Sequence, residues 1–162
     1  MRVAILSDIH GNLLALEAVL ADMDSAGPFD QVVVAGDLVW AGPRPREVVD
    51  RVMSLGAAVI QGNTDAFFNV KPDDAPDGKE ASRFSVHLAW MREQLGKERV
   101  AYLRKLPFSH RISPAGPGAP PGDHDLLIVH ANPYDLERPI MPQMRDSDLD
   151  ELLLADALPP FA

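Results

Sequence analysis

VAILSDIHGN (residues 3–12) begins with an apolar run and then changes to polar residues that can bind metal ions. The run Val3–Leu6 does not alternate polar and apolar positions, which is typical of a strand buried on both faces of a parallel sheet. Asp8 and His10 follow at its carboxyl end. Because ligands of open α/β sheets bind beyond the carboxyl ends of the strands, we expect both side chains to line a binding site.

The same pattern of a buried strand followed by a possible metal ligand recurs three times. Each further run has four residues, and a side chain with a ligand oxygen or nitrogen follows within three positions. If the strands lie in one parallel sheet, these ligands meet at one edge of that sheet. The runs and their ligands are Val32–Ala35 with Asp37, Ala57–Ile60 with Asn63, and Leu126–Val129 with His130.

Helical patterns separate the runs, and the order β-α-β-α-β is typical of a doubly wound α/β sheet. Apolar residues recur at helical spacing, and Gly or Pro follows each stripe. Asn12 is a candidate N-cap of the first helix. The stripes are Leu16–Met23 before Gly27, Val48–Leu55 before Gly56, Phe84–Leu95 before Gly96, and Val100–Leu106 before Pro107.

Three other segments interrupt or follow this pattern. We expect an exposed loop at Asn69–Lys79 and a flexible surface insertion at Ser113–Asp123, which is rich in Pro and Gly. The acidic stretch Asp146–Glu151 predicts the start of a solvated helix, because the spacing of an EF-hand calcium loop is absent.

The candidate ligands indicate the kind of metal. The chain has no cysteine, and imidazole with carboxylate suits Mn, Fe, Ni or Zn better than Mg. Two divalent ions held close together need a bridging anion, and Asp37 on a central strand is the natural bridge. Gly36 and Gly62 would let the backbone approach the ions closely.

Composition limits the other function classes. The 162 residues suffice for a single domain, and the formal net charge is −9 without any cluster of Lys or Arg. Acidity and the lack of a basic patch argue against binding to duplex nucleic acid. No apolar stretch reaches the roughly 18 residues that a membrane span needs. We therefore expect a cytoplasmic protein.

Four motifs in this order resemble those of the calcineurin-like metallophosphoesterases, particularly the small single-domain phosphodiesterases of bacteria and archaea. The motifs are SDIHGN (7–12), GDLVWAGPRPREVV (36–49), GNTD (62–65) and LLIVHANP (126–133). The resemblance implies an α/β fold in which a β-sandwich is flanked by helices. It also implies a dinuclear phosphoesterase, in which a metal-bridging hydroxide attacks a small or nucleotide-like phosphodiester.

The resemblance also assigns roles to residues. Asp8, His10 and Asp37 would hold the first metal, and Asp37, Asn63 and His130 the second. Asp37 and Asn63 would thus be the catalytic residues, while Asn12, Asn63 and Thr64 would contact the substrate.

The sequence departs from the family pattern at two places. Thr64 stands where many members carry His, which favours a phosphodiesterase; beside it, Asp65 is either a support for the ligands or a helix N-cap. The second departure is that no Gly-His-x-His segment follows His130. We therefore expect the C-terminal part of the second sheet to be missing, as after a truncation or frameshift. Exposed apolar surface would then favour a homo-oligomer.

Other interpretations stay open. A non-catalytic metallophosphoesterase-like scaffold that binds a partner protein is the alternative to an enzyme. Trp40 is expected to pack rather than contact substrate, and Arg44 and Arg46 fit either a phosphate contact or a solvated helix start. The remaining histidines are expected to be structural or exposed, namely His87, His110 and His124.

Overall fold

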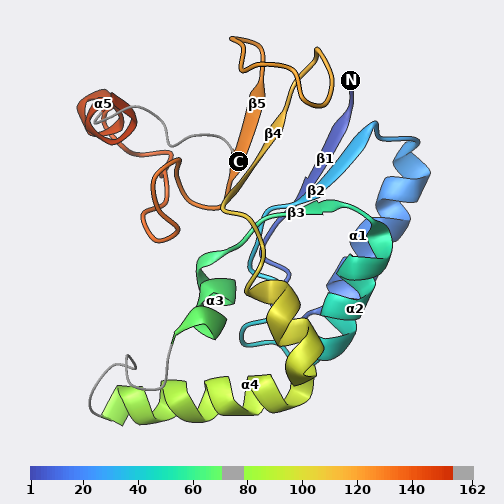
Figure 1. Ribbon diagram of the computed structural model, residues 1–162, viewed down its shortest axis with the longest axis vertical. Helices are drawn as coiled ribbons and strands as arrows, with labels where there is room; N and C mark the ends of the chain where they lie inside the picture. Colours follow the sequence, from blue (N-terminus) through green and yellow to red (C-terminus); the bar gives the residue numbers. More distant parts are fainter. Residues whose placement is uncertain (71–78, 155–162) are drawn as a thin grey trace.

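Two small β-sheets face each other in the computed structural model, which describes residues 1–70 and 79–154 (Figure 1). The first sheet is parallel, in the order β1-β2-β3. The second is an antiparallel pair, β4 and β5. The strands are β1 (Val3–Leu6), β2 (Gln31–Val34), β3 (Ala58–Val59), β4 (Ser109–Ile112) and β5 (Leu126–Val129).

The helices begin and end close to the predicted signals. The side chain of Asn12 accepts a hydrogen bond from the amide of Ala15 at the start of the first helix, and left-handed Gly56 ends the second. The predicted helices on either side of Gly96 form one contiguous element, which bends at this glycine (φ 70°). The helices are α1 (Leu13–Ala26), α2 (Pro45–Leu55), α3 (Asn63–Ala66), the 3₁₀ turn η1 (Phe67–Asn69), α4 (Lys79–Leu103) and α5 (Asp146–Leu154).

The first sheet buries a different layer on each face. On one face, Leu6 and Val34 pack in a core with apolar residues of α1, α2 and α4. On the other, Val33 and Ile60 pack against Ile112 of β4 and Ile128 of β5. This sandwich flanked by helices confirms the fold that the resemblance implied (Figure 1).

The expectation of a doubly wound sheet is wrong for the described residues. The β-α-β-α-β order fixes right-handed parallel connections but does not decide what covers the second face. That face is covered by β4 and β5 rather than by helices.

Three details of the strand prediction are also corrected. Leu126–Val129 does not join the parallel sheet but pairs antiparallel with Ser109–Ile112, a strand that the sequence pattern missed. Ile5 and Leu126 are 51% and 42% exposed, so β1 and β5 are not buried on both faces. An apolar run predicts a strand but does not identify its partner, and the residues of β4 are mostly polar.

The structure describes one of the two predicted loops in full. Most of the Asn69–Lys79 loop, residues 71–78, lies outside the described residues. The Ser113–Asp123 insertion consists of turns without helix or strand. At its base, the guanidinium of Arg111 lies 2.5 Å from the carboxylate of Asp125 and donates to the carbonyl of Ala119 at 2.6 Å. The flexibility of the insertion stays a prediction.

The predicted helix at Asp146–Glu151 is confirmed as the first part of α5. Among the helices that the structure describes, none has the length and apolar character of a membrane span.

Candidate metal centre

The residues at the ends of β1 and β2 have an unusual backbone. Asp8, His10 and Asp37 have φ values of 57°, 48° and 56°, in the left-handed region. A non-glycine residue costs about 1–3 kcal/mol in such a conformation, and such strain concentrates at functional sites. Hydrogen bonds between the two loops hold this backbone conformation. The amide of Asp8 donates to the carbonyl of Gly36, and the amide of His10 donates to the carbonyl of Asp37.

The first group of candidate ligands is Asp8, His10 and Asp37. One ligand atom from each lies within 4.8 Å of the others. Nε2 of His10 lies 3.6 Å from Oδ1 of Asp8 and 3.5 Å from Oδ2 of Asp37. Its Nδ1 lies 3.0 Å from the carbonyl oxygen of Trp40. Because a carbonyl can only accept, Nδ1 carries a proton, and Nε2 is the ring atom that faces the two carboxylates.

The second group is Asp37, Asn63 and His130. Nδ1 of His130 lies 2.8 Å from the carbonyl oxygen of Ala35, which fixes the same tautomer as in His10. Its Nε2 lies 3.1 Å from Oδ1 of Asn63 and 3.6 Å from Oδ1 of Asp37. In this group, too, a ring nitrogen and side-chain oxygens converge.

Asp37 connects the two groups through its two carboxylate oxygens. Oδ2 faces His10, whereas Oδ1 faces His130. The side chain is only 5% exposed, so water screens its charge poorly. The amide of Thr64 donates to Oδ1 at 3.0 Å and helps to fix this orientation.

The donor set fits two divalent cations. Two ligand atoms that share a metal at about 2.1 Å lie roughly 3–3.5 Å apart, close to the separations seen here. Each group brings a ring nitrogen against an oxygen of Asp37 and an oxygen of one further side chain, so a cation between these atoms would have three protein ligands.

Two glycines bring the loops after β2 and β3 together. A Cβ at Gly36 (φ 89°) would lie 2.4 Å from the amide nitrogen of Gly62. A Cβ at Gly62 would lie 2.1 Å from Oδ1 of Asp37. Any side chain at either position would separate Asp37 from Asn63, so the two glycines allow the loops to meet; their predicted close approach to the ions stays a prediction.

Comparison with known proteins identifies the family of this chain. Residues 1–159 match the family model of the calcineurin-like phosphoesterases. The chain belongs to this family. It is 29% identical over 81% of its length to an uncharacterized protein of Methanocaldococcus jannaschii, covering 49% of that protein. It is 32% identical over 99% of its length to a symmetrical bis(5'-nucleosyl)-tetraphosphatase of Pectobacterium carotovorum, covering 54% of it.

A solved structure agrees with this assignment. A metallophosphoesterase from Sphaerobacter thermophilus superposes with a TM-score of 0.61 at 35% identity, over 86% of this chain and 51% of the other. The chain thus spans about half the length of these relatives. The family is one of hydrolytic phosphoesterases that use divalent metals.

In this metallophosphoesterase chain, Asp65 has a role that the sequence left open. It is the third residue of α3 and not its N-cap, which is Gly62. Its carboxylate accepts hydrogen bonds from the amides of Asp37, Leu38 and Gly62. Burial is the largest influence on its pKa, which is raised to about 6, although the amide hydrogen bonds oppose the rise. No sequence signal tells which amides such a carboxylate meets.

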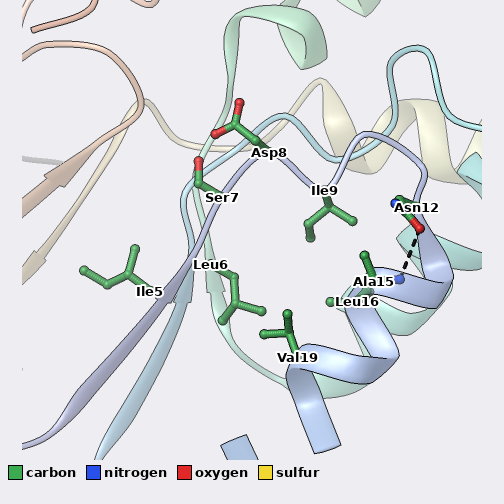
Figure 2. A pocket seen from close by; sticks show the side chains of 9 residues that line it. All are labelled: Ile5, Leu6, Ser7, Asp8, Ile9, Asn12, Ala15, Leu16 and Val19. Atoms are coloured by element: carbon green, nitrogen blue, oxygen red, sulfur yellow. Dashed lines mark hydrogen bonds between the residues drawn. The ribbon is translucent and has the colours of Figure 1, made fainter. Parts of the chain in front are cut away.

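The two other predicted substrate contacts lie beside the candidate ligands. Asn12 lines a recess of about 480 Å³ with Asp8 and His10, on the exposed side of the site. It also borders an apolar recess of about 310 Å³ between β1 and α1, where Figure 2 shows its side chain capping α1. The hydroxyl of Thr64 is buried and has no hydrogen-bond partner among the described residues.

The remaining candidates lie outside the ligand groups. The ring of Trp40 packs against Phe67, Phe84 and His87, as the packing interpretation predicted. The Nε atom of Arg44 lies 3.0 Å from Glu47 at the start of α2. The contribution that the sequence could not reveal is that of main-chain carbonyls, since those of Ala35 and Trp40 orient the two histidines.

Proposed function

We propose that this chain holds two divalent transition-metal ions (Mn, Fe, Ni or Zn) and hydrolyses small, nucleotide-like phosphodiesters. One observation carries the proposal: the two oxygens of Asp37 face different histidines, as a bridging carboxylate requires. The name of the Pectobacterium relative supports a nucleotide-like substrate.

The candidate residues would bind the two ions and the substrate in the following way. Asp8, His10 and Asp37 would hold one ion, and Asp37, Asn63 and His130 the other. Such ions supply Lewis acidity at phosphoryl oxygens and lower the pKa of water at neutral pH. With Oδ1 of Asn63 turned toward His130, its Nδ2 amide group is the donor that would orient a substrate oxygen. Asn12 and Thr64 would border the substrate, with Asn12 at the open recess.

Thr64 favours a phosphodiesterase over a monoesterase that depends on acid assistance. A threonine hydroxyl has no useful acidity near neutral pH, so this position would not protonate a poor leaving group. Substrates with good leaving groups, such as nucleoside phosphates or aryl phosphates, would not need that proton. The substrate preference is therefore expected to follow leaving-group acidity.

The test is hydrolysis of bis(p-nitrophenyl) phosphate with Mn²⁺ and with a chelator, together with metal analysis. We expect Mn²⁺-dependent turnover, about two ions per chain, and loss of both in Asp37→Asn. Asp50→Asn is the matched control, because Asp50 pairs with Arg99 between α2 and α4 and touches no candidate ligand. A folded chain that binds no metal and shows no Mn²⁺-dependent turnover would instead support the scaffold alternative, in which the surface binds a partner protein.

A further inference from the structure

Asp65 joins two loops that carry candidate metal ligands. Oδ2 accepts hydrogen bonds from the amides of Asp37 at 2.8 Å and Gly62 at 3.0 Å. Oδ1 accepts from the amide of Leu38 at 3.0 Å. The residue is 0% exposed. One buried carboxylate thus contacts the main chain of the loop after β2 and of the loop after β3.

These bonds act where the backbone is under strain. Asp37 has a left-handed conformation, and a hydrogen bond to its amide helps to hold it there. Gly62 immediately precedes Asn63, so the hydrogen bond from the Gly62 amide to Asp65 fixes the backbone position of Asn63. Asp65 therefore determines the separation between a candidate bridging ligand and a ligand of the second group.

The first group is anchored differently. Nδ1 of His10 is held by the carbonyl of Trp40, and the amide of His10 donates to the carbonyl of Asp37. The amide of Gly11 donates to the carbonyl of Leu38. These contacts keep the loop after β1 on the loop after β2 without Asp65.

We propose that Asp65 is a positioning residue that builds the second metal site by fixing Asn63 against Asp37. The inference rests on the proposed function, because it concerns the same pair of ions. Asp65 touches neither ion and acts only through the main chain. Its loss should therefore change the two metal affinities unequally, whereas a merely structural role would change them together.

The test compares wild type with Asp65→Asn by calorimetric titration with Mn²⁺ at a temperature where both are folded. An amide side chain cannot accept three hydrogen bonds from the same amides without turning its own N–H groups toward one of them. We expect the affinity for the second ion to fall about 10–100-fold and the affinity for the first ion, which also uses Asp37, to fall less. Electron paramagnetic resonance should then show isolated Mn²⁺ in the variant and coupled Mn²⁺ pairs in wild type. Asp50→Asn controls for a general loss of stability.

The outcomes separate this inference from the proposed function. Two ions in wild type and equal weakening, or no weakening, of both sites in Asp65→Asn would overturn the role of Asp65 alone. A folded wild-type chain without any bound ion would overturn both. If Asp65→Asn does not fold, hydrogen exchange in metal-loaded wild type decides. Protected amides at Asp37, Leu38 and Gly62 support the inference, and fast exchange at these three overturns it.

Discussion

Nε2 of His130 lies 3.1 Å from Oδ1 of Asn63, although the two residues are 67 positions apart. His130 follows β5 in the second sheet, and Asn63 follows β3 in the first. The second ligand group therefore forms only when the two sheets pack, through residues such as Ile60 and Ile128. Packing of the two sheets therefore also assembles this half of the site.

Replacing His130 by Ala should remove one ion. The ring contributes the Nε2 atom beside Oδ1 of Asp37 and Oδ1 of Asn63, whereas the imidazole of His10 faces the other oxygen of Asp37. We expect one ion per chain and a fall in turnover of about 100-fold or more, measured by metal analysis and aryl phosphate hydrolysis. His124→Ala is the control, since His124 is exposed next to the insertion. Two retained ions in His130→Ala would contradict the assignment.

Metal binding should stabilise the chain. Cations held by the candidate ligands favour the folded form, and a ligand at 100 times its Kd adds about 2.7 kcal/mol to the free energy of unfolding. We expect Mn²⁺ to raise Tm and a chelator to reverse the rise, measured by thermal denaturation. The rise should be largely absent in Asp37→Asn. An equal rise in that variant would place the stabilising ions elsewhere.

Thr64→Val tests the buried hydroxyl. Because Oγ1 has no hydrogen-bond partner among the described residues, its burial costs free energy that a methyl group does not. We expect the free energy of unfolding to rise by about 1 kcal/mol, measured by urea denaturation. If turnover falls while stability rises, the hydroxyl contributes to substrate binding. A loss of stability would show that the hydroxyl finds a partner, such as water.

Gly62→Ala should damage the site without altering any ligand. The added Cβ would lie 2.1 Å from Oδ1 of Asp37 and would force the loops after β2 and β3 apart. We expect a loss of roughly 1–3 kcal/mol in stability and weaker binding of both ions. The control is Gly122→Ala, whose Cβ meets nothing within 4 Å. Unchanged metal affinity in Gly62→Ala would contradict the role of this close approach.

The insertion should loosen at low pH. Hydrogen bonds from Ser113, from the amide of Gly122 and from Arg111 lower the pKa of Asp125. A carboxyl with a lowered folded pKa stabilises the fold above its unfolded pKa of about 3.9 and loses this as pH falls through the folded value. We expect faster hydrogen exchange at residues 113–123 below about pH 4. At neutral pH, Arg111→Ala should produce the same increase, and Arg104→Ala should not.

The sequence predicted local elements well and their partners less well. Val3–Leu6, the helix after Asn12 and the turn at Gly56 follow from short-range patterns, and all three are confirmed. The predicted partner of β5 was wrong because an apolar run does not identify the strand beside it. β4 was missed because only Ile112 in it is buried.

The candidate site was predictable to a similar degree. Each candidate ligand stands at a recognisable break after an apolar run, so the sequence could propose the set. The orientation of the histidines depends on the carbonyls of Ala35 and Trp40, and the spacing of the loops depends on Asp65. These contacts involve the main chain, which every residue has, so no residue type announces them.

The left-handed backbone at Asp8, His10 and Asp37 has a consequence for engineering. Gly adopts this conformation at the least cost, so it would relieve strain at all three positions. A screen that rewards heat resistance alone, in the presence of a chelator, should therefore enrich such replacements and erase the metal centre. Laboratory evolution of a more robust form would have to score metal retention in every round.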